Sequence, residues 1–215
     1  MLEFALPTDR PLHLLCLGAH SDDIEIGCGG TLLKLLGADA QISVTWVVLS
    51  ASGPRAEEAR ASADLFLRGA AEREVIIQTF RDGHFPFQGS QIKDFFETLK
   101  RVPTPDLIFT HTRDDRHQDH RVVSDLTWNT FRNHLIFEYE IAKYDGDLGQ
   151  PNTFVRLPES VAKRKLELLM ECFPSQRQRG WFDADTFSSL MRLRGVEANA
   201  PSRFAEGFHA RKLVL

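Results

Sequence analysis

The sequence predicts an α/β domain with three layers, in which helices cover both faces of a mainly parallel β-sheet. Short apolar runs of strand length recur along the chain, and longer amphipathic stretches of helical period separate them. With 215 residues, of which 42% are hydrophobic, the chain is long enough to bury one substantial core. Alternation of this kind is typical of strands joined by right-handed helical crossovers.

The predicted strands are nearly continuous apolar runs, which is the pattern of strands buried on both faces of a sheet. They comprise residues 12–18, 42–49, 74–80, 106–110 and 134–141. The predicted helices between them comprise residues 30–36, 56–67, 90–101 and 120–132. In the second helix, Ala59, Ala63 and Phe66 recur at helical spacing and charged residues occupy the other side. This order of elements predicts a Rossmann-like fold.

The remainder of the chain has a less regular pattern. It predicts helices over residues 159–173 and 183–193 and a last strand over residues 211–215. The sequence contains no internal repeat, low-complexity tract or Gly/Ser-rich linker. Residues 1–215 are therefore interpreted as a single domain.

Composition and charge exclude several classes of protein. The formal net charge is −4, whereas dedicated nucleic-acid-binding proteins usually carry a clear basic excess. No apolar run approaches the roughly 18 residues of a membrane-spanning helix, and the first ten residues lack the basic region of a secretory signal. Three widely spaced cysteines without a CxxC pair exclude a cysteine-based zinc ribbon and favour a reducing compartment. We therefore expect a cytoplasmic protein with no transmembrane segment and no nucleic-acid partner.

Polar clusters follow two of the predicted strands at the point where each strand ends. They comprise residues 18–31 and 110–121, and they contain four of the eight histidines of the chain. Ligands of parallel α/β sheets bind at the carboxyl ends of the strands. We therefore expect these two loops to lie side by side and to form the functional site.

Residues of the two clusters suit a catalytic metal site. His20 and Asp23 lie on a tight turn after a strand, where an imidazole and a carboxylate can converge on one ion. His120, at the predicted start of a helix, is the natural third ligand. A catalytic zinc ion can be held by two histidines and one aspartate, which leaves one coordination position open for water. Such an ion lowers the pKa of bound water towards about 7, and Asp22 is then free to act as general base.

A second pair of residues, His117 and Asp119, suits a different task. A carboxylate that holds an imidazole favours its protonated form, which can stabilise an oxyanion or protonate a leaving group. Each residue of the two clusters also has an ordinary interpretation as part of a turn or a helix cap, and Asp119 could simply be an N-cap. The glycine-rich residues 27–30 match neither common phosphate-binding pattern, and they indicate backbone crowding where the loop meets the helix.

The two clusters also carry a family resemblance. AHSDDIE at residues 19–25 followed by GCGGT at 27–31 resembles the AHPDDE…GCGGT motif of the PIG-L/LmbE-like deacetylases. TH at residues 110–111 followed by DRHQDHR at 115–121 resembles the second motif of that family, H…D-x-H-P-D-H. The resemblance implies a zinc-dependent enzyme that removes the acetyl group from N-acetylglucosamine units. Ser21 and Gln118 replace the prolines of the two motifs, which loosens the turns without removing a ligand or a charge.

Looser similarity extends over most of the chain. It comprises RAEE at residues 55–58, FRDG at 80–83, YE at 139–140 and FAEGF at 204–208. Carried over by position, the resemblance implies metal ligands at His20, Asp23 and His120, a general base at Asp22, and oxyanion stabilisation or acid catalysis by His117 with Asp119. It also places Arg55 and Asp82 near the sugar hydroxyls. His84 lies in a predicted rim loop with aromatic residues that could stack on a sugar, and His111 could support the site or only form a turn.

The predicted function is hydrolysis of the acetamide of an N-acetylated amino sugar, or of its conjugate, by a Zn²⁺-dependent N-deacetylase. Ferrous iron is the alternative metal. Two other functions stay open: a non-catalytic sugar- or nucleotide-binding module, and a non-haem Fe(II) oxygenase, whose metal also takes two histidines and one carboxylate. Facial triads of that kind generally occur in all-β barrels, which the alternating pattern disfavours. The expected partner is a small or conjugated amino-sugar substrate, and assembly into a homo-oligomer is left open.

Overall fold

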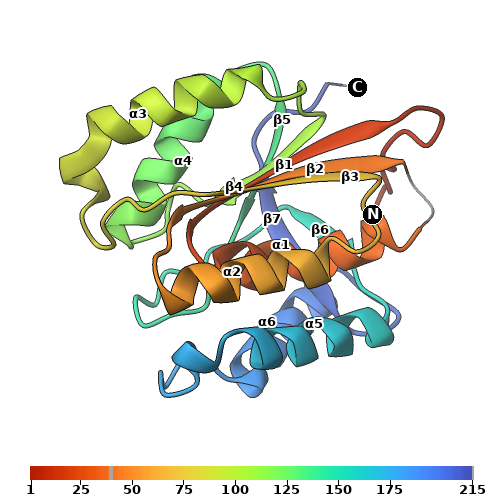
Figure 1. Ribbon diagram of the computed structural model, residues 1–215. Coiled ribbons are helices and arrows are strands. Elements are labelled where there is room, and N and C mark those ends of the chain that lie inside the picture. Colours follow the sequence, from red (N-terminus) through yellow and green to blue (C-terminus); the bar gives the residue numbers. More distant parts are fainter. Residues whose placement is uncertain (39–40, 215) are drawn as a thin grey trace.

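A seven-stranded sheet forms the centre of the molecule in the computed structural model, which describes residues 1–38 and 41–214 (Figure 1). The strands are β1 (Leu12–His20), β2 (Ile42–Ser50), β3 (Glu72–Ile77), β4 (Leu107–His111), β5 (Leu135–Tyr139), β6 (Thr153–Arg156) and β7 (Ala205–Ala210). Their order in the sheet is β3-β2-β1-β4-β5-β7-β6. The first five strands run parallel, and β7 and β6 add an antiparallel edge. The mainly parallel sheet predicted from the sequence is confirmed.

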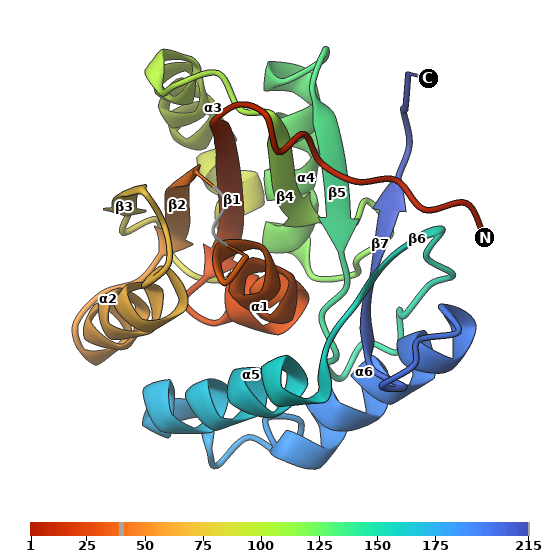
Figure 2. The ribbon, with the colours of Figure 1, turned by 90° about the vertical axis from the view of Figure 1, so that its right-hand side faces the viewer.

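Helices cover both faces of this sheet (Figures 1 and 2). They are α1 (Asp23–Leu36), α2 (Pro54–Phe66), α3 (Gly89–Thr98), α4 (Gln118–Thr130), α5 (Glu159–Cys172) and α6 (Ala184–Glu197). Three short 3₁₀ helices accompany them: η1 (Phe85–Gln88), η2 (Leu99–Arg101) and η3 (Pro174–Gln176). Helices α3 and α4 lie on one face and α1 and α2 on the other, where α5 packs across their outer side. Among residues 1–38 and 41–214, no helix combines the length and the apolarity that crossing a membrane requires.

Two apolar cores hold these layers together, one on each face of the sheet. On the side of α1, α2 and α5, Cys28, Phe66 and Leu168 belong to one buried cluster that includes alternate side chains of β1 and β2. On the side of α3 and α4, Phe96 and Val123 belong to a second cluster with the other side chains of the same strands. Burial on both faces explains why the strand segments read as continuous apolar runs.

The first helix differs most from its predicted bounds, because it begins at Asp23 and not at residue 30. Its glycines lie within the helix, where neighbouring side chains leave no room for a Cβ atom. A Cβ on Gly29 would lie 2.6 Å from the Phe66 ring, and one on Gly30 would lie 2.6 Å from Leu157. The predicted crowding around residues 27–30 is therefore present, but inside the helix and not at its junction with the loop.

The predicted last strand is wrong for residues 211–214, which adopt no regular structure, and residue 215 lies outside the described residues. The strand at the end of the fold is instead β7, and the sequence pattern predicts neither β7 nor β6. Strand β6 is only four residues long and half-buried. In β7, the charged residue Glu206 interrupts the apolar run. It is nevertheless buried, and Lys165 Nζ stabilises the buried carboxylate by donating a 2.6 Å hydrogen bond to it.

Adding a methyl group at Gly27 is expected to destabilise the fold. The new Cβ would overlap the ring of Tyr139, which is fully buried and cannot move aside freely. We expect Gly27→Ala to lower the free energy of unfolding by about 1–3 kcal/mol, as measured by urea denaturation. Gly89→Ala is the matched control, because its Cβ would meet nothing within 4 Å and its φ of −54° is helical. Equal stability of the two variants would contradict the packing argument.

Candidate metal centre

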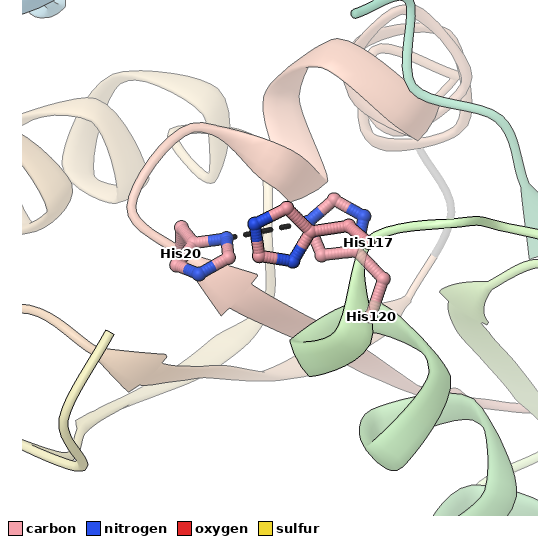
Figure 3. Close-up of side chains that lie close together, drawn as sticks. All are labelled: His20, His117 and His120. Carbon is pink, nitrogen blue, oxygen red and sulfur yellow. Dashed lines mark hydrogen bonds between the residues drawn. The ribbon is translucent and has the colours of Figure 1, made fainter. Parts of the chain in front are cut away.

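The two predicted polar clusters meet where the central strands β1 and β4 end. These strands are neighbours in the sheet, and the chain order reverses between them, which is where ligands of open α/β sheets bind. His20 is the last residue of β1 and Asp23 the first residue of α1, while His120 lies in the first turn of α4. Figure 3 shows the rings of His20, His117 and His120 gathered at this point.

The three predicted metal ligands place their donor atoms at similar separations. His20 Nδ1 lies 3.2 Å from His120 Nε2 and 3.4 Å from Asp23 Oδ2. His120 Nε2 lies 3.5 Å from Asp23 Oδ1. Ligands held about 2.0–2.1 Å from a tetrahedral zinc ion are separated by about 3.3 Å. These two distances run to different oxygens of Asp23, and the donor groups compact enough for one ion are His20 with His117 and His120, Asp23 with His111 and His120, and His20 with Asp82 and Asp119. The three predicted ligands therefore lie close together and belong to these overlapping groups, and the His20 side chain keeps 15% of its surface open to solvent.

Carboxylates contact the other ring nitrogen of both histidines. His120 Nδ1 lies 2.9 Å from Asp115 Oδ2. His20 Nε2 lies 3.1 Å from Asp82 Oδ1 and 3.3 Å from Asp119 Oδ2. Metal-bound histidines nearly always donate their second N–H group in this way, which fixes the tautomer and leaves the first nitrogen with a free lone pair. The contacts therefore suit His20 Nδ1 and His120 Nε2 as metal-binding atoms.

Asp119 does not hold the His117 ring, contrary to the prediction from the sequence. Its carboxylate faces His20 and accepts hydrogen bonds from the backbone N–H groups of Gly83, at 2.7 Å, and Phe85, at 3.1 Å. Only the backbone N–H of Asp119 contacts His117, donating to Nδ1 at 3.3 Å. Asp119 is also not the N-cap of α4, because the cap residue is His117 itself.

The expected protonated form of His117 is disfavoured as a result. Burial is the main cause that lowers the pKa of His117, and the neighbouring His20 lowers it further. Because Nδ1 accepts the N–H of Asp119, the neutral ring carries its proton on Nε2. The lowered pKa favours a neutral His117, and its ligand atom lies within 4.8 Å of those of His20 and His120, so His117 is also a candidate metal ligand.

Asp22, next to Asp23 in the chain, has one oxygen engaged and one free. Its Oδ1 accepts a 3.0 Å hydrogen bond from Arg55 Nη2. Its Oδ2 is buried and finds no hydrogen-bond partner among the described residues. Burial raises the pKa of Asp22, and the Arg55 charge opposes that shift. A buried carboxylate with a free oxygen and a raised pKa is suited to accept a proton.

Two residues that the sequence interpretation left without a firm role also belong to this centre. His111 is fully buried, stacks on the His120 ring at 3.9 Å and has Nε2 3.2 Å from Asp23 Oδ2. Its Nε2 lone pair accepts the backbone N–H of Ala19, so it is less suited to metal binding than that of His20. Asp115 holds His120 and also accepts the backbone N–H of His117 at 2.8 Å. The sequence feature that could have indicated this role of Asp115 is its position in the second motif, five residues before His120.

The predicted sugar-binding residues differ in their distance from the centre. Arg55 contacts Asp22, and Asp82 contacts His20 with 75% of its side chain exposed. His84 instead contacts its own loop: Nδ1 lies 3.0 Å from the Asp82 carbonyl oxygen, and the ring lies 6.2 Å from that of Phe87. The contacts described for His84 thus leave it outside the cluster.

Comparison with known proteins identifies the family. Residues 15–131 match the family model described as PIG-L, GlcNAc-PI de-N-acetylase. The chain belongs to the PIG-L family. It is 29% identical over 120 residues to the uncharacterised deacetylase YaiS of Escherichia coli (strain K12), a match that covers 51% of this chain. The matched part spans 63% of the length of that relative, which is less than two thirds.

Several solved structures share the fold of this chain. The conserved protein TT1542 of Thermus thermophilus is 20% identical with a TM-score of 0.72, covering 95% of this chain and 96% of that one. The N,N'-diacetylchitobiose deacetylase of Pyrococcus horikoshii is 20% identical with a TM-score of 0.70, covering 93% and 83%. GalB, the 4-carboxy-2-hydroxymuconate hydratase of Pseudomonas putida KT2440, is 18% identical with a TM-score of 0.74, covering 95% and 98%. Because a hydratase shares the fold, the fold alone does not determine the reaction.

Proposed function

We propose that this protein is a metal-dependent N-deacetylase that hydrolyses the acetamide of an N-acetylated amino sugar, of the N-acetylglucosamine type, or of its conjugate. The observation that carries the proposal is the free, buried Oδ2 of Asp22, next in the chain to Asp23, which belongs with His20 and His120 to a cluster of candidate metal donors. Membership of the PIG-L family and the fold shared with a diacetylchitobiose deacetylase support an acetylated sugar as the substrate.

The residues of the centre account for the proton transfers of such a reaction. His20, Asp23 and His120 would hold the ion, which supplies Lewis acidity and an acidified water when it is bound. Asp22 Oδ2 accepts a proton from the water that attacks the acetyl carbon. His117 donates a hydrogen bond from Nε2 to the carbonyl oxygen as negative charge develops on that oxygen. When the C–N bond breaks, Asp22 returns its proton to the amine, so that water and acetamide yield acetate and a free amino sugar.

Zinc is the metal that we propose, with ferrous iron as the alternative, because two imidazoles and one carboxylate suit either ion. The mainly parallel, helix-covered sheet argues against the oxygenase alternative, whose triads generally occupy all-β barrels. We also propose a cytoplasmic location, since all three cysteines are buried free thiols, which a reducing compartment preserves. A homo-oligomer remains compatible with these proposals.

Metal removal is expected to abolish acetate release. The test is an enzymatic acetate assay across free, nucleotide-linked and lipid-linked N-acetylated sugars, with and without a chelator. We expect release from at least one N-acetylglucosamine-type compound, loss after chelation and recovery on adding Zn²⁺, because the proposed water is acidified only by the ion. Chelator-resistant release would contradict the metal dependence. Sugar binding without release from any compound would instead favour the non-catalytic binding module.

A further inference from the structure

The contacts of Arg55 differ from those expected of a residue that grips a sugar. Arg55 is the second residue of α2, and its Nη2 donates to Asp22 Oδ1 at 3.0 Å. Its Nη1 donates to Glu58 Oε2 at 2.9 Å and to Ser175 Oγ at 3.3 Å. The guanidinium also lies over the buried ring of Phe173, 5.7 Å from its centroid. Both terminal nitrogens of the guanidinium are thus directed at groups of the protein.

Glu58, one turn further along α2, is itself held in place. It is buried, and its Oε1 accepts the backbone N–H of Ser175 at 2.9 Å. Its Oε2 accepts the Ser175 hydroxyl at 2.7 Å. Ser175 belongs to η3, which lies outside the residues 15–131 that match the family model. A continuous set of directional contacts therefore runs from the connection between α5 and α6 to the side chain of Asp22.

We propose that Arg55, Glu58 and Ser175 are positioning residues that fix the orientation of the Asp22 carboxylate. A planar guanidinium bonded to carboxylates on two sides has little rotational freedom. By holding Oδ1 of Asp22, it fixes the plane of the carboxylate and with it the direction of the unpartnered Oδ2. A catalytic group displaced by about 1 Å can lose about 100-fold in rate, so this restraint affects turnover and not substrate affinity. The inference rests on the proposed function, in which Asp22 is the base.

Glu58→Gln and Glu57→Gln form the matched test. Both substitutions remove one negative charge from adjacent positions of α2. The Glu57 side chain is exposed and has no hydrogen bond or ion pair to the described residues, whereas Glu58 is buried and anchors Arg55. We expect Glu58→Gln to lower kcat about 10–100-fold with KM nearly unchanged, and Glu57→Gln to leave both constants unchanged. Ser175→Ala keeps the backbone hydrogen bond to Glu58 and should produce a smaller loss in kcat.

Arg55→Ala distinguishes positioning from sugar binding. Guanidinium chloride at a concentration that does not unfold the protein should restore part of the kcat of this variant, because the free cation can occupy the space beside Asp22 and Glu58. A variant whose KM rises while kcat stays constant would overturn the proposal and return Arg55 to the sugar-binding role. Loss of activity through misfolding is detected separately by the thermal midpoint of each variant.

A crystal structure of the Glu58→Gln protein tests the same link without any turnover. We expect the Arg55 guanidinium to leave Asp22 in this variant and to stay in place in Glu57→Gln. An Arg55 that keeps its contact with Asp22 in Glu58→Gln would overturn the proposal. If the wild-type protein releases no acetate and Glu58→Gln still displaces Arg55, the proposed function is wrong while the positional link between Glu58 and Asp22 is right.

Discussion

Replacing Asp22 with Asn is expected to lower kcat by about 10²–10⁴-fold while the metal content stays unchanged. The amide has nearly the same shape as the carboxylate and can still accept the hydrogen bond from Arg55 at the position of Oδ1. It cannot accept a proton from water at the position of Oδ2, which has no partner among the described residues. Steady-state acetate release and elemental analysis of the purified protein measure the two quantities.

The neutral control for this variant is Asp94→Asn, which removes the same charge from an exposed position on α3. We expect that control to match the wild-type protein in both measurements. Full turnover in Asp22→Asn would show that another group accepts the proton. Loss of the metal together with turnover would make Asp22 a ligand and would remove the distinction between Asp22 and Asp23 on which the proposed mechanism depends.

The parallel part of the sheet could be predicted from the sequence because its signal is local. Strands β1 and β2 are buried on both faces, so most residues of each segment are apolar. Strand β7 lacks such a signal, since the charge of Glu206 suggests an exposed position. In the fold, Lys165 of α5 and the backbone N–H groups of Gly30 and Thr31 in α1 hydrogen-bond that carboxylate. These partners are distant in sequence, so a local pattern cannot indicate that Glu206 is buried.

The candidate site could be located from the sequence, but its internal contacts could not. The ends of neighbouring parallel strands meet at one edge of the sheet, so His20, Asp23 and His120 were expected to converge. The direction of the Asp119 carboxylate depends instead on the loop after β3, whose Gly83 and Phe85 N–H groups attract it towards His20. No spacing rule specifies where that loop lies. The pairing of Asp119 with His117 was therefore a wrong inference from their short separation along the chain.

Metal affinity should fall steeply in His120→Ala and less steeply in Asp115→Asn. His120 Nε2 is one of only three proposed protein donors, so its removal leaves the ion with two. Asp115 does not face the ion but holds His120 Nδ1 at 2.9 Å, and outer partners of this kind usually contribute about 10–100-fold to affinity. We expect zinc titration against a competing chelator to give a loss of about 10–100-fold for Asp115→Asn and a larger loss for His120→Ala.

His134→Ala provides the control for the metal titration, because His134 precedes β5 and so lies at the opposite edge of the sheet from the centre. Its zinc affinity should equal that of the wild-type protein. Equal affinities for His120→Ala and the control would exclude His120 as a ligand and would favour the donor group without it, His20 with Asp82 and Asp119. A loss in Asp115→Asn as large as that in His120→Ala would indicate that Asp115 does more than orient the imidazole. In that case the ion pair between Asp115 Oδ1 and Lys143 Nζ, 3.1 Å apart, would also contribute to holding the metal centre together.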